Sequence, residues 1–271
     1  MGALAVIASL AVFPALAQTT DQLKREVASI GVEEKLGAAV PGSASFTDSE
    51  GRPLTLADLG GRPLLLSFNY TSCPRLCGLQ LSGLSRALRD LGWSGDRFGV
   101  LTVSIDPNEQ RSQLARFKQV HVREAGGGAG VERAWRFVTG SQAEVAALAE
   151  AVGFKYRYDP RTREYAHQAT LVVLTGGGRV SGYLHGISYP APALTAALAR
   201  ASTNRIATSE EQRSVGGFLL SCMGYDPADP APLALKAMRT GGTMALVFLV
   251  SFLGFQALRS ARRRRLLGKA P

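Results

Sequence analysis

The stretch that decides the fold runs from Leu64 to Leu91 and reads LLLSFNYTSCPRLCGLQLSGLSRALRDL. Its first seven residues form a short, nearly continuous apolar run, which is typical of a strand covered on both faces. From about Arg75 to Leu91 leucines recur every three or four residues, and this spacing predicts a helix. Two cysteines, Cys73 and Cys77, therefore lie where a buried strand gives way to a helix.

The residues on either side continue the alternation of strands and helices. Short apolar runs predict strands at Phe98–Ile105, Trp135–Val138, Ala169–Thr175 and Arg179–Leu184, and periodic apolar residues predict helices at Ser112–Val120, Ser141–Val152 and Thr195–Ala201. Ser45–Thr47 and Pro53–Thr55 flank a turn and predict a small N-terminal hairpin. The glycine-rich run Ala125–Gly130 is expected to be a loop without regular structure. Together these elements predict an α/β sandwich around a mixed sheet.

The charge of the chain is concentrated at one end. The 271 residues carry 31 basic and 21 acidic side chains, a net charge of +10, but residues 259–271 alone hold six basic residues and no acid. The remainder, with 25 basic and 21 acidic groups, is only mildly basic, and its 7% aromatic content does not favour stacking on bases. No nucleic-acid partner is therefore predicted, and 3 Cys exclude a small disulfide-stapled scaffold.

Both ends of the chain predict a membrane protein. Thr240–Leu258 is an uncharged run of nineteen residues followed by Arg262–Arg265, which predicts a membrane-spanning helix with a cytoplasmic basic tail. The apolar residues 1–17 end in Ala-Leu-Ala and predict a signal peptide, the alternative being an uncleaved first span. In either case the globular part lies outside the bacterial cytoplasmic membrane, in the periplasm.

The predicted organisation has six parts. In chain order these are a signal peptide at 1–17, a linker or short amphipathic helix at 18–40, a globular domain at 41–203, a tether at 204–239, a transmembrane helix at 240–258 and a basic cytoplasmic tail at 259–271.

The two cysteines have a chemically suitable location. The N-terminus of a helix carries partial positive charge and free N–H groups, which stabilise a thiolate. A spacing of four residues places both sulfurs on one face of the helical turn, close enough to bind one ion. A disulfide between Cys73 and Cys77 is the alternative, although an i, i+4 pair on a regular helix is more awkward to close than a C-x-x-C pair. The pair therefore predicts a soft-metal or redox site.

The order of several motifs resembles the Sco/SenC family. The motifs are FNYTSCPRLC at 68–77, VSIDP at 103–107, Thr139-Gly140 and Tyr165-Ala166-His167. Members of this family are thioredoxin-like, with a peroxiredoxin-like sandwich, and are membrane-tethered copper proteins that help to assemble the CuA centre of cytochrome c oxidase. The resemblance covers about residues 42–205.

The resemblance implies a ligand set for one copper ion, Cu(I) or Cu(II). The two motif cysteines and the distant histidine of the family match Cys73, Cys77 and His167. Two thiolates and an imidazole also suit copper on chemical grounds, whereas a closed zinc site prefers a fourth ligand. Ala166 stands where the family often has an aspartate before the histidine, and this leaves open which group orients the imidazole.

Other residues are candidates for accessory roles. Asp106 has three possible roles: it contacts the metal ligands without binding the metal, it docks a partner protein, or it is only a helix-cap or turn residue. Cys222 and Met223 are possible accessory copper contacts on the tether. His121 and His185 have no partners identifiable from sequence.

Three functions compete. The leading one is a non-enzymatic copper metallochaperone that serves subunit II of cytochrome c oxidase or another copper-dependent oxidase. The second is a thiol-disulfide oxidoreductase with Cys73 as the nucleophile and Cys77 as the resolving thiol. The third is a redox or copper sensor. Other periplasmic copper carriers and thioredoxin-like reductants are expected as further partners.

Overall fold

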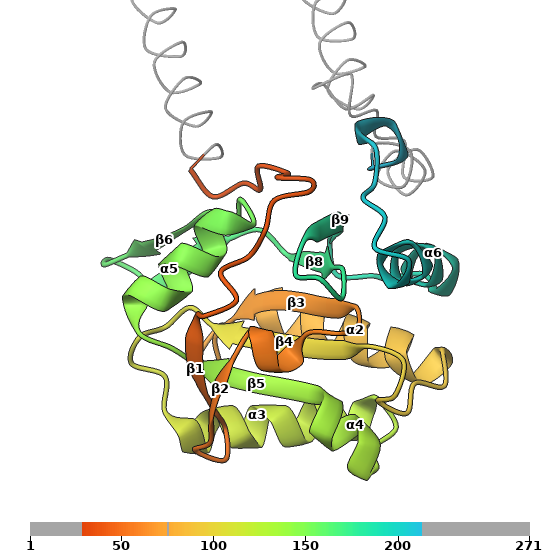
Figure 1. The fold of residues 1–271 in the computed structure, drawn as a ribbon. Coiled ribbons are helices and arrows are strands. Elements are labelled where there is room, and N and C mark those ends of the chain that lie inside the picture. Colours follow the sequence, from red (N-terminus) through yellow and green to blue (C-terminus); the bar gives the residue numbers. More distant parts are fainter. Residues whose placement is uncertain (1–28, 75, 213–271) are drawn as a thin grey trace, which may run out of the picture. The chain divides into compact units, whose positions relative to one another are not determined.

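The computed structural model describes residues 29–74 and 76–212. Its main element is a seven-stranded mixed sheet in the order β2-β1-β5-β4-β3-β8-β9 (Figure 1). The strands are β1 Ser45–Asp48, β2 Pro53–Thr55, β3 Leu64–Asn69, β4 Gly99–Ser104, β5 Trp135–Thr139, β8 Thr170–Leu174 and β9 Val180–His185. The central strands β3, β4 and β5 are parallel, and β8 and β1 pair antiparallel to them on either side.

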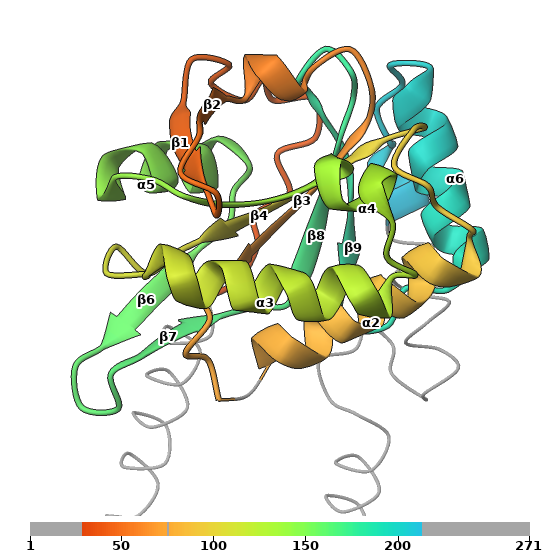
Figure 2. The ribbon, with the colours of Figure 1, turned by 90° about the horizontal axis from the view of Figure 1, so that it is seen from below.

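Helices cover both faces of this sheet. Helix α5 (Gln142–Ala151) lies on one face, and α2 (Leu76–Asp90), α3 (Arg111–Glu124) and α4 (Ala129–Ala134) lie on the other (Figures 1 and 2). Helix α6 (Ala191–Ser202) packs against β8, β9 and α2, and a 3-10 turn, η1 (Ala57–Leu59), follows β2. The fold is the α/β sandwich around a mixed sheet that the alternating pattern predicts, and it has the thioredoxin-like architecture that the family resemblance implies.

The core explains why the central strands read as continuous apolar runs. Every residue of β3, β4 and β8 is buried, because these strands carry a layer on each face. On the α5 side, Leu66 and Phe68 of β3 pack into one apolar cluster with Leu148 of α5 and Phe154, whose ring stacks on Phe68 at a centroid distance of 4.5 Å. Cys77 belongs to this cluster, so the predicted site is built on its edge.

Most of the predicted elements are present, with shifted ends. Helix α3 extends four residues beyond Val120, and α6 begins four residues before Thr195. The cap of α5 is as expected, because the Ser141 hydroxyl accepts a hydrogen bond from the Glu144 N–H at 3.2 Å. The N-terminal hairpin pairs Ser45 with Thr55.

Two elements differ from the sequence prediction. A two-stranded hairpin, β6 (Tyr156–Asp159) and β7 (Glu164–His167), was not predicted, because its short strands are mostly polar or half-exposed. The glycine-rich run was predicted to have no regular structure, but Ala129 and Gly130 already belong to α4. Only the three glycines before them, at positions 126–128, adopt positive φ, a conformation that suits a loop.

The segments that flank the predicted domain lie along it. Residues 29–40 form no helix but run as an extended segment with isolated bridges from Val32 to Phe154 and from Ala39 to Arg179. Beyond α6, the Gln212 amide donates to the Tyr183 carbonyl at 2.6 Å and accepts from the Tyr183 N–H at 3.1 Å. Both described segments therefore pair with or pack against the body of the fold.

Several predictions fall outside the described residues. These are the signal peptide, the first part of the linker, most of the tether with Cys222 and Met223, the Thr240–Leu258 span and the basic tail. Within residues 29–74 and 76–212, the structure contains no helix with the length and apolar character that crossing a membrane requires.

Candidate metal centre

The two cysteines lie at the carboxyl end of β3. Cys73 is in the turn that follows the strand and is half-buried, whereas Cys77 is in the first turn of α2 and fully buried. Pro74 lies between them. It lacks an N–H group, but at the start of a helix the N–H groups have no partner within the helix, so nothing is lost. The strand, the turn and the helix therefore bring both sulfurs to the same edge of the sheet.

The histidine comes from the unpredicted hairpin. His167 is the last residue of β7 and pairs with Tyr156 of β6. Its ring contacts Phe154 and Tyr70 at centroid distances of 5.8 and 6.2 Å, and only 8% of the residue is exposed. The hairpin thus carries an imidazole across the edge of the sheet to the thiols, ninety residues from Cys77.

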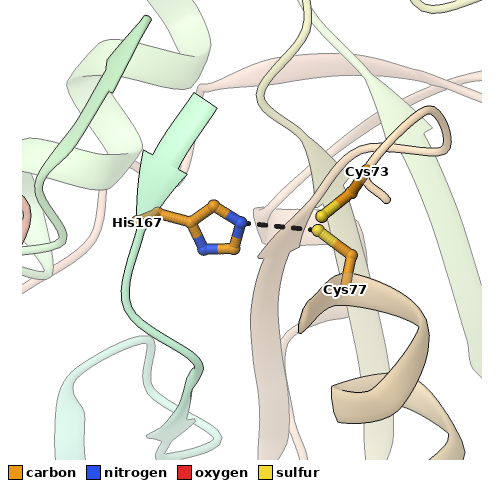
Figure 3. Close-up of side chains that lie close together, drawn as sticks. All are labelled: Cys73, Cys77 and His167. Atoms are coloured by element: carbon orange, nitrogen blue, oxygen red, sulfur yellow. Dashed lines mark hydrogen bonds between the residues drawn. The ribbon is translucent and has the colours of Figure 1, made fainter. Parts of the chain in front are cut away.

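The three donor atoms converge. His167 Nε2 lies 3.4 Å from Cys77 Sγ, and the Cys73, Cys77 and His167 donors all lie within 4.8 Å of one another (Figure 3). With metal bonds of roughly 2.0–2.3 Å, donors around one three-coordinate ion stand about 3.5–4 Å apart. The arrangement therefore needs only a small contraction to hold one ion.

A backbone carbonyl orients the imidazole. His167 Nδ1 lies 3.2 Å from the carbonyl oxygen of Gln168, which can only accept a hydrogen bond. The Nδ1 atom is therefore the donor of this hydrogen bond, and Nε2 is the ring nitrogen that faces Cys77. This contact supplies the orienting partner that Ala166, in place of an aspartate, cannot provide.

The thiols are not electrostatically equivalent. The hydrogen bond between Cys77 and Cys73, together with burial, raises the pKa of the Cys77 thiol. Cys73 is the more exposed of the two and also contacts the Tyr70 hydroxyl, whose own pKa is raised chiefly by burial and then by Cys73. Cys77 is therefore the thiol that gives up its proton less readily.

Asp106, His121 and His185 are not among the possible metal ligands of the described residues. The Asp106 carboxylate accepts from the Asn108 N–H at 2.9 Å, an Asx turn, and does not belong to the Cys73, Cys77 and His167 group. His121 is buried beside Glu124 of its own helix, and His185 pairs with Glu34 at 2.8 Å. Cys222 and Met223 lie beyond the described residues.

Two neighbours of the site were missed in the sequence. Tyr70 follows β3, and its hydroxyl accepts from the Tyr165 N–H at 3.2 Å, which ties the cysteine turn to β7. Glu109 follows β4 and accepts from the N–H and hydroxyl of Thr71. Tyr70 stands within the motif, but its partner is 95 residues away, and no local pattern marks Glu109.

Several solved structures are similar to this chain. A proposed electron transfer protein from Aquifex aeolicus VF5 has 27% identity and a TM-score of 0.56, with 62% of this chain and 95% of that one covered. BsSco, of the Sco family of cytochrome c oxidase assembly proteins, has 22% identity and a TM-score of 0.50, covering 64% and 97%. Bradyrhizobium japonicum ScoI, solved with copper bound, has 23% identity and a TM-score of 0.49, covering 59% and 98%. No curated protein matches in sequence.

The fold and the site define a class of protein: a thioredoxin-like domain in which two thiols at a strand-to-helix junction meet an imidazole from a hairpin. Within this class the family is settled by the sequence match. The SCO1/SenC family model matches residues 32–203, more than half of the chain, and the chain belongs to this family. The resemblance inferred from the motifs is therefore confirmed.

Proposed function

We propose that this protein is a copper metallochaperone that holds one copper ion at Cys73, Cys77 and His167 and passes it to the CuA site of a terminal cytochrome c oxidase. The observation that carries the proposal is the convergence of two thiols and one imidazole nitrogen within 4.8 Å. Family membership supports the oxidase as the destination. Copper is the cargo in this proposal.

The donor set favours copper over the other common ions. Thiolates and imidazole are soft or borderline ligands that suit Cu(I), and imidazole also suits Cu(II), whereas magnesium and calcium require oxygen ligands. Structural zinc sites are almost always four-coordinate, and the group contains three donors among the described residues. A three-donor site also leaves room for a donor from an acceptor protein, which a carrier needs.

Loading the site requires the loss of a proton. His167 Nδ1 donates to the Gln168 carbonyl, so Nε2 is the ring nitrogen that faces the thiols. The Cys77 thiol, whose pKa is raised, must release its proton when the metal binds. Copper affinity is therefore expected to rise with pH, since lower proton concentration favours the thiolate form. A titration that shows no proton release would contradict a role for Cys77 as a thiolate ligand.

Unloading is expected to begin at Cys73. Cys77 is fully buried and His167 is 8% exposed, so an incoming donor reaches the ion most easily beside the half-buried Cys73. Exchange would then replace the Cys73 bond first, with His167 and Cys77 holding the ion until the acceptor has taken it. The accessible thiolate thus serves as the leaving ligand of the transfer.

The proposal is tested by counting ligands and following the cargo. The full chain, purified in detergent and reduced, is titrated anaerobically with Cu(I), and X-ray absorption is expected to show one copper with two sulfur ligands and one nitrogen ligand. Copper should then move to a metal-free CuA domain, and the Cys73→Ser variant should deliver less. Absence of bound copper, or loaded copper that never transfers, would overturn the proposal.

A thiol-disulfide oxidoreductase is the second candidate. One observation favours it: a half-buried Cys73 in front of a buried Cys77 is the arrangement expected of a nucleophile and its resolving thiol. This function requires both cysteines and not the histidine. Reduction of a disulfide in the oxidase subunit by the His167→Ala variant at the wild-type rate, with copper transfer abolished, would separate the two activities. Retention of both functions in Cys73→Ser would exclude this mechanism.

The proposed location follows from the sequence of the two termini. We place the domain in the periplasm, anchored by Thr240–Leu258, with residues 259–271 in the cytoplasm. Alkaline phosphatase fused after residue 239 should be active, and green fluorescent protein fused after residue 271 should fluoresce. The reverse pattern of the two reporters would contradict this orientation.

A further inference from the structure

Glu109 joins the ends of two neighbouring strands. Its carboxylate lies in the connection between β4 and α3 and is half-buried. One oxygen accepts from the Thr71 N–H at 2.8 Å and from the Ser104 hydroxyl at 3.0 Å, and the other accepts from the Thr71 hydroxyl. Ser104 is the last residue of β4, so the carboxylate connects the turn after β3 to the end of the adjacent strand.

The two thiols of the site are consequently held in different ways. Cys77 belongs to α2, is fully buried and lies within the apolar core cluster, so the helix and the core fix its sulfur. Cys73 lies in the turn between β3 and α2, two residues after Thr71. The direct contacts of its side chain to Tyr70 and Cys77 are within the site itself. One contact that reaches this turn from another part of the fold is the Glu109 carboxylate, which accepts from Thr71.

An ionised carboxylate is well suited to this task. It accepts several hydrogen bonds at once, and such charge-assisted bonds are roughly twice as strong as those between neutral groups. Here the Thr71 donors are a backbone N–H and the hydroxyl of the same residue, so both the position and the side-chain direction of Thr71 are restrained. The restraint reaches Cys73 through two peptide units.

We propose that Glu109 is a positioning residue that, through Thr71, holds Cys73 at the distance from Cys77 and His167 that metal binding requires. The metal part of this inference rests on the copper-binding function proposed above. The positional part does not, because it concerns the freedom of the Cys73 thiol in the metal-free protein. Glu109 itself does not belong to the group of possible metal ligands.

The first readout is the reactivity of the free thiol. In the reduced, metal-free full chain, iodoacetamide alkylation of Cys73 and Cys77 is followed separately by mass spectrometry of peptides. Glu109→Gln places an amide where a carboxylate accepted three hydrogen bonds, so the turn is released and Cys73 alkylation should become several-fold faster. Cys77 alkylation should change little, because helix α2 still holds it.

The second readout is the affinity for Cu(I), measured by competition with a chromophoric chelator. Loss of a residue that orients a ligand typically weakens metal binding about 10- to 100-fold, and this is the loss expected for Glu109→Gln with one copper still bound. Thr71→Val, which removes only the hydroxyl, should give a smaller loss, and Thr71→Ser should stay close to wild type. If the loss of affinity decreases from Glu109→Gln to Thr71→Val to Thr71→Ser, it depends on the number of hydrogen bonds removed and not on general damage to the fold.

The matched control is Glu124→Gln. Glu124 is also a half-exposed carboxylate that accepts from a serine hydroxyl, Ser82, but it contacts His121 and not the cysteine turn. Neither the alkylation rate nor the copper affinity should change in this variant. If Glu109→Gln, with an unchanged circular dichroism spectrum, alkylates and binds copper as the wild type does, the inference is wrong.

The experiment separates this inference from the proposed function. If the wild-type chain binds no copper, the metallochaperone proposal fails, whereas the alkylation rates still decide whether Glu109 restrains Cys73. If copper binds normally and alkylation is unaffected by Glu109→Gln and by Thr71→Val, the positioning role alone is excluded.

Discussion

Two buried histidines in different regions of the molecule have different surroundings. His121, in α3, is 3% exposed, and its Nδ1 lies 3.0 Å from the Glu124 carboxylate. Its Nε2 has no hydrogen-bond partner among the described residues, and the ring lies between Phe117 and Trp135. His167, in β7, is 8% exposed, and its Nε2 faces a thiol while its Nδ1 donates to a carbonyl.

Burial alone therefore does not identify a histidine as a metal ligand. Both imidazoles have one nitrogen engaged by an oxygen atom, so the surroundings of the other nitrogen decide what each ring can do. Around His121 that nitrogen has no hydrogen-bond partner among the described residues, and the ring packs against Phe117 and Trp135 as part of the helical layer. Around His167 it meets Cys77 and Cys73 within 4.8 Å. The group opposite the free nitrogen is what distinguishes the two roles.

The largest expected effect concerns copper. His167→Ala removes one of three ligands and should lower the affinity for Cu(I) by more than about 100-fold, the upper end of what residues that merely orient a ligand contribute. His121→Ala should leave the affinity within about twofold, because its nitrogen lies in a different region. Both are measured on the reduced full chain by competition with a chromophoric Cu(I) chelator.

If His167→Ala binds copper with wild-type affinity, His167 is not a copper ligand and does not differ from His121 in this respect. A similar loss in both variants would point to global unfolding, which the near-ultraviolet circular dichroism of each protein detects.

The second effect concerns stability. A substitution near His121 should destabilise the fold strongly but leave copper binding unchanged. Trp135 is fully buried against His121 and Phe137, and its indole N–H donates to the Thr102 hydroxyl at 3.0 Å. Trp135→Ala leaves a large cavity and should lower the free energy of unfolding by about 3–5 kcal/mol. Copper stoichiometry of the folded fraction should be unchanged, because the site is built on other elements.

A matched aromatic control is Tyr158→Ala, since Tyr158 is 47% exposed on the β6–β7 hairpin. Its cost should stay below about 0.5 kcal/mol in the same denaturation experiment. Equal costs at the two positions would mean that the helical layer around His121 does not support the fold as argued.

Sequence reasoning recovered the region around the cysteines better than the region around the histidine. The strand and helix flanking Cys73 and Cys77 were predictable because burial on two faces and helical periodicity leave clear patterns in one short stretch. The β6–β7 hairpin left none, since each of its strands has only four residues and charged residues such as Arg157 and Glu164 interrupt any apolar alternation. His167 was therefore assigned by resemblance, while the element that positions it was missed.

The contacts around the site illustrate the same limit. The carbonyl of Gln168 that orients His167 is a backbone atom, which exists at every position and cannot be singled out in a sequence. Glu109 acts on a residue 38 positions away, and only the parallel pairing of β3 with β4 brings the two together. Such partners depend on strand order, which local patterns do not determine.

The smallest expected effect uses pH to separate the two histidines through stability. Burial lowers the pKa of His121, and the neighbouring Glu124 opposes this only in part. The unfolded chain, in which the histidine titrates near its ordinary value of about 6.5, therefore takes up a proton before the folded protein does. This contribution to the free energy of unfolding is fully present above pH 6.5 and is lost progressively as the pH falls towards the lower, folded-state pKa.

His121→Gln tests this directly, because glutamine can still donate to Glu124 but does not titrate. Chemical denaturation of metal-free protein at pH 7.5 and pH 5.5 should show a smaller decrease in stability for this variant than for the wild type. Glu124, whose pKa lies below its usual value, stays ionised over this interval and does not confuse the comparison. The ring contacts with Phe117 and Trp135 enclose His121 and disfavour its protonated form in the folded protein. If the wild type and the variant lost the same stability between the two pH values, His121 would bind its proton as tightly in the folded as in the unfolded state, and the prediction would be wrong.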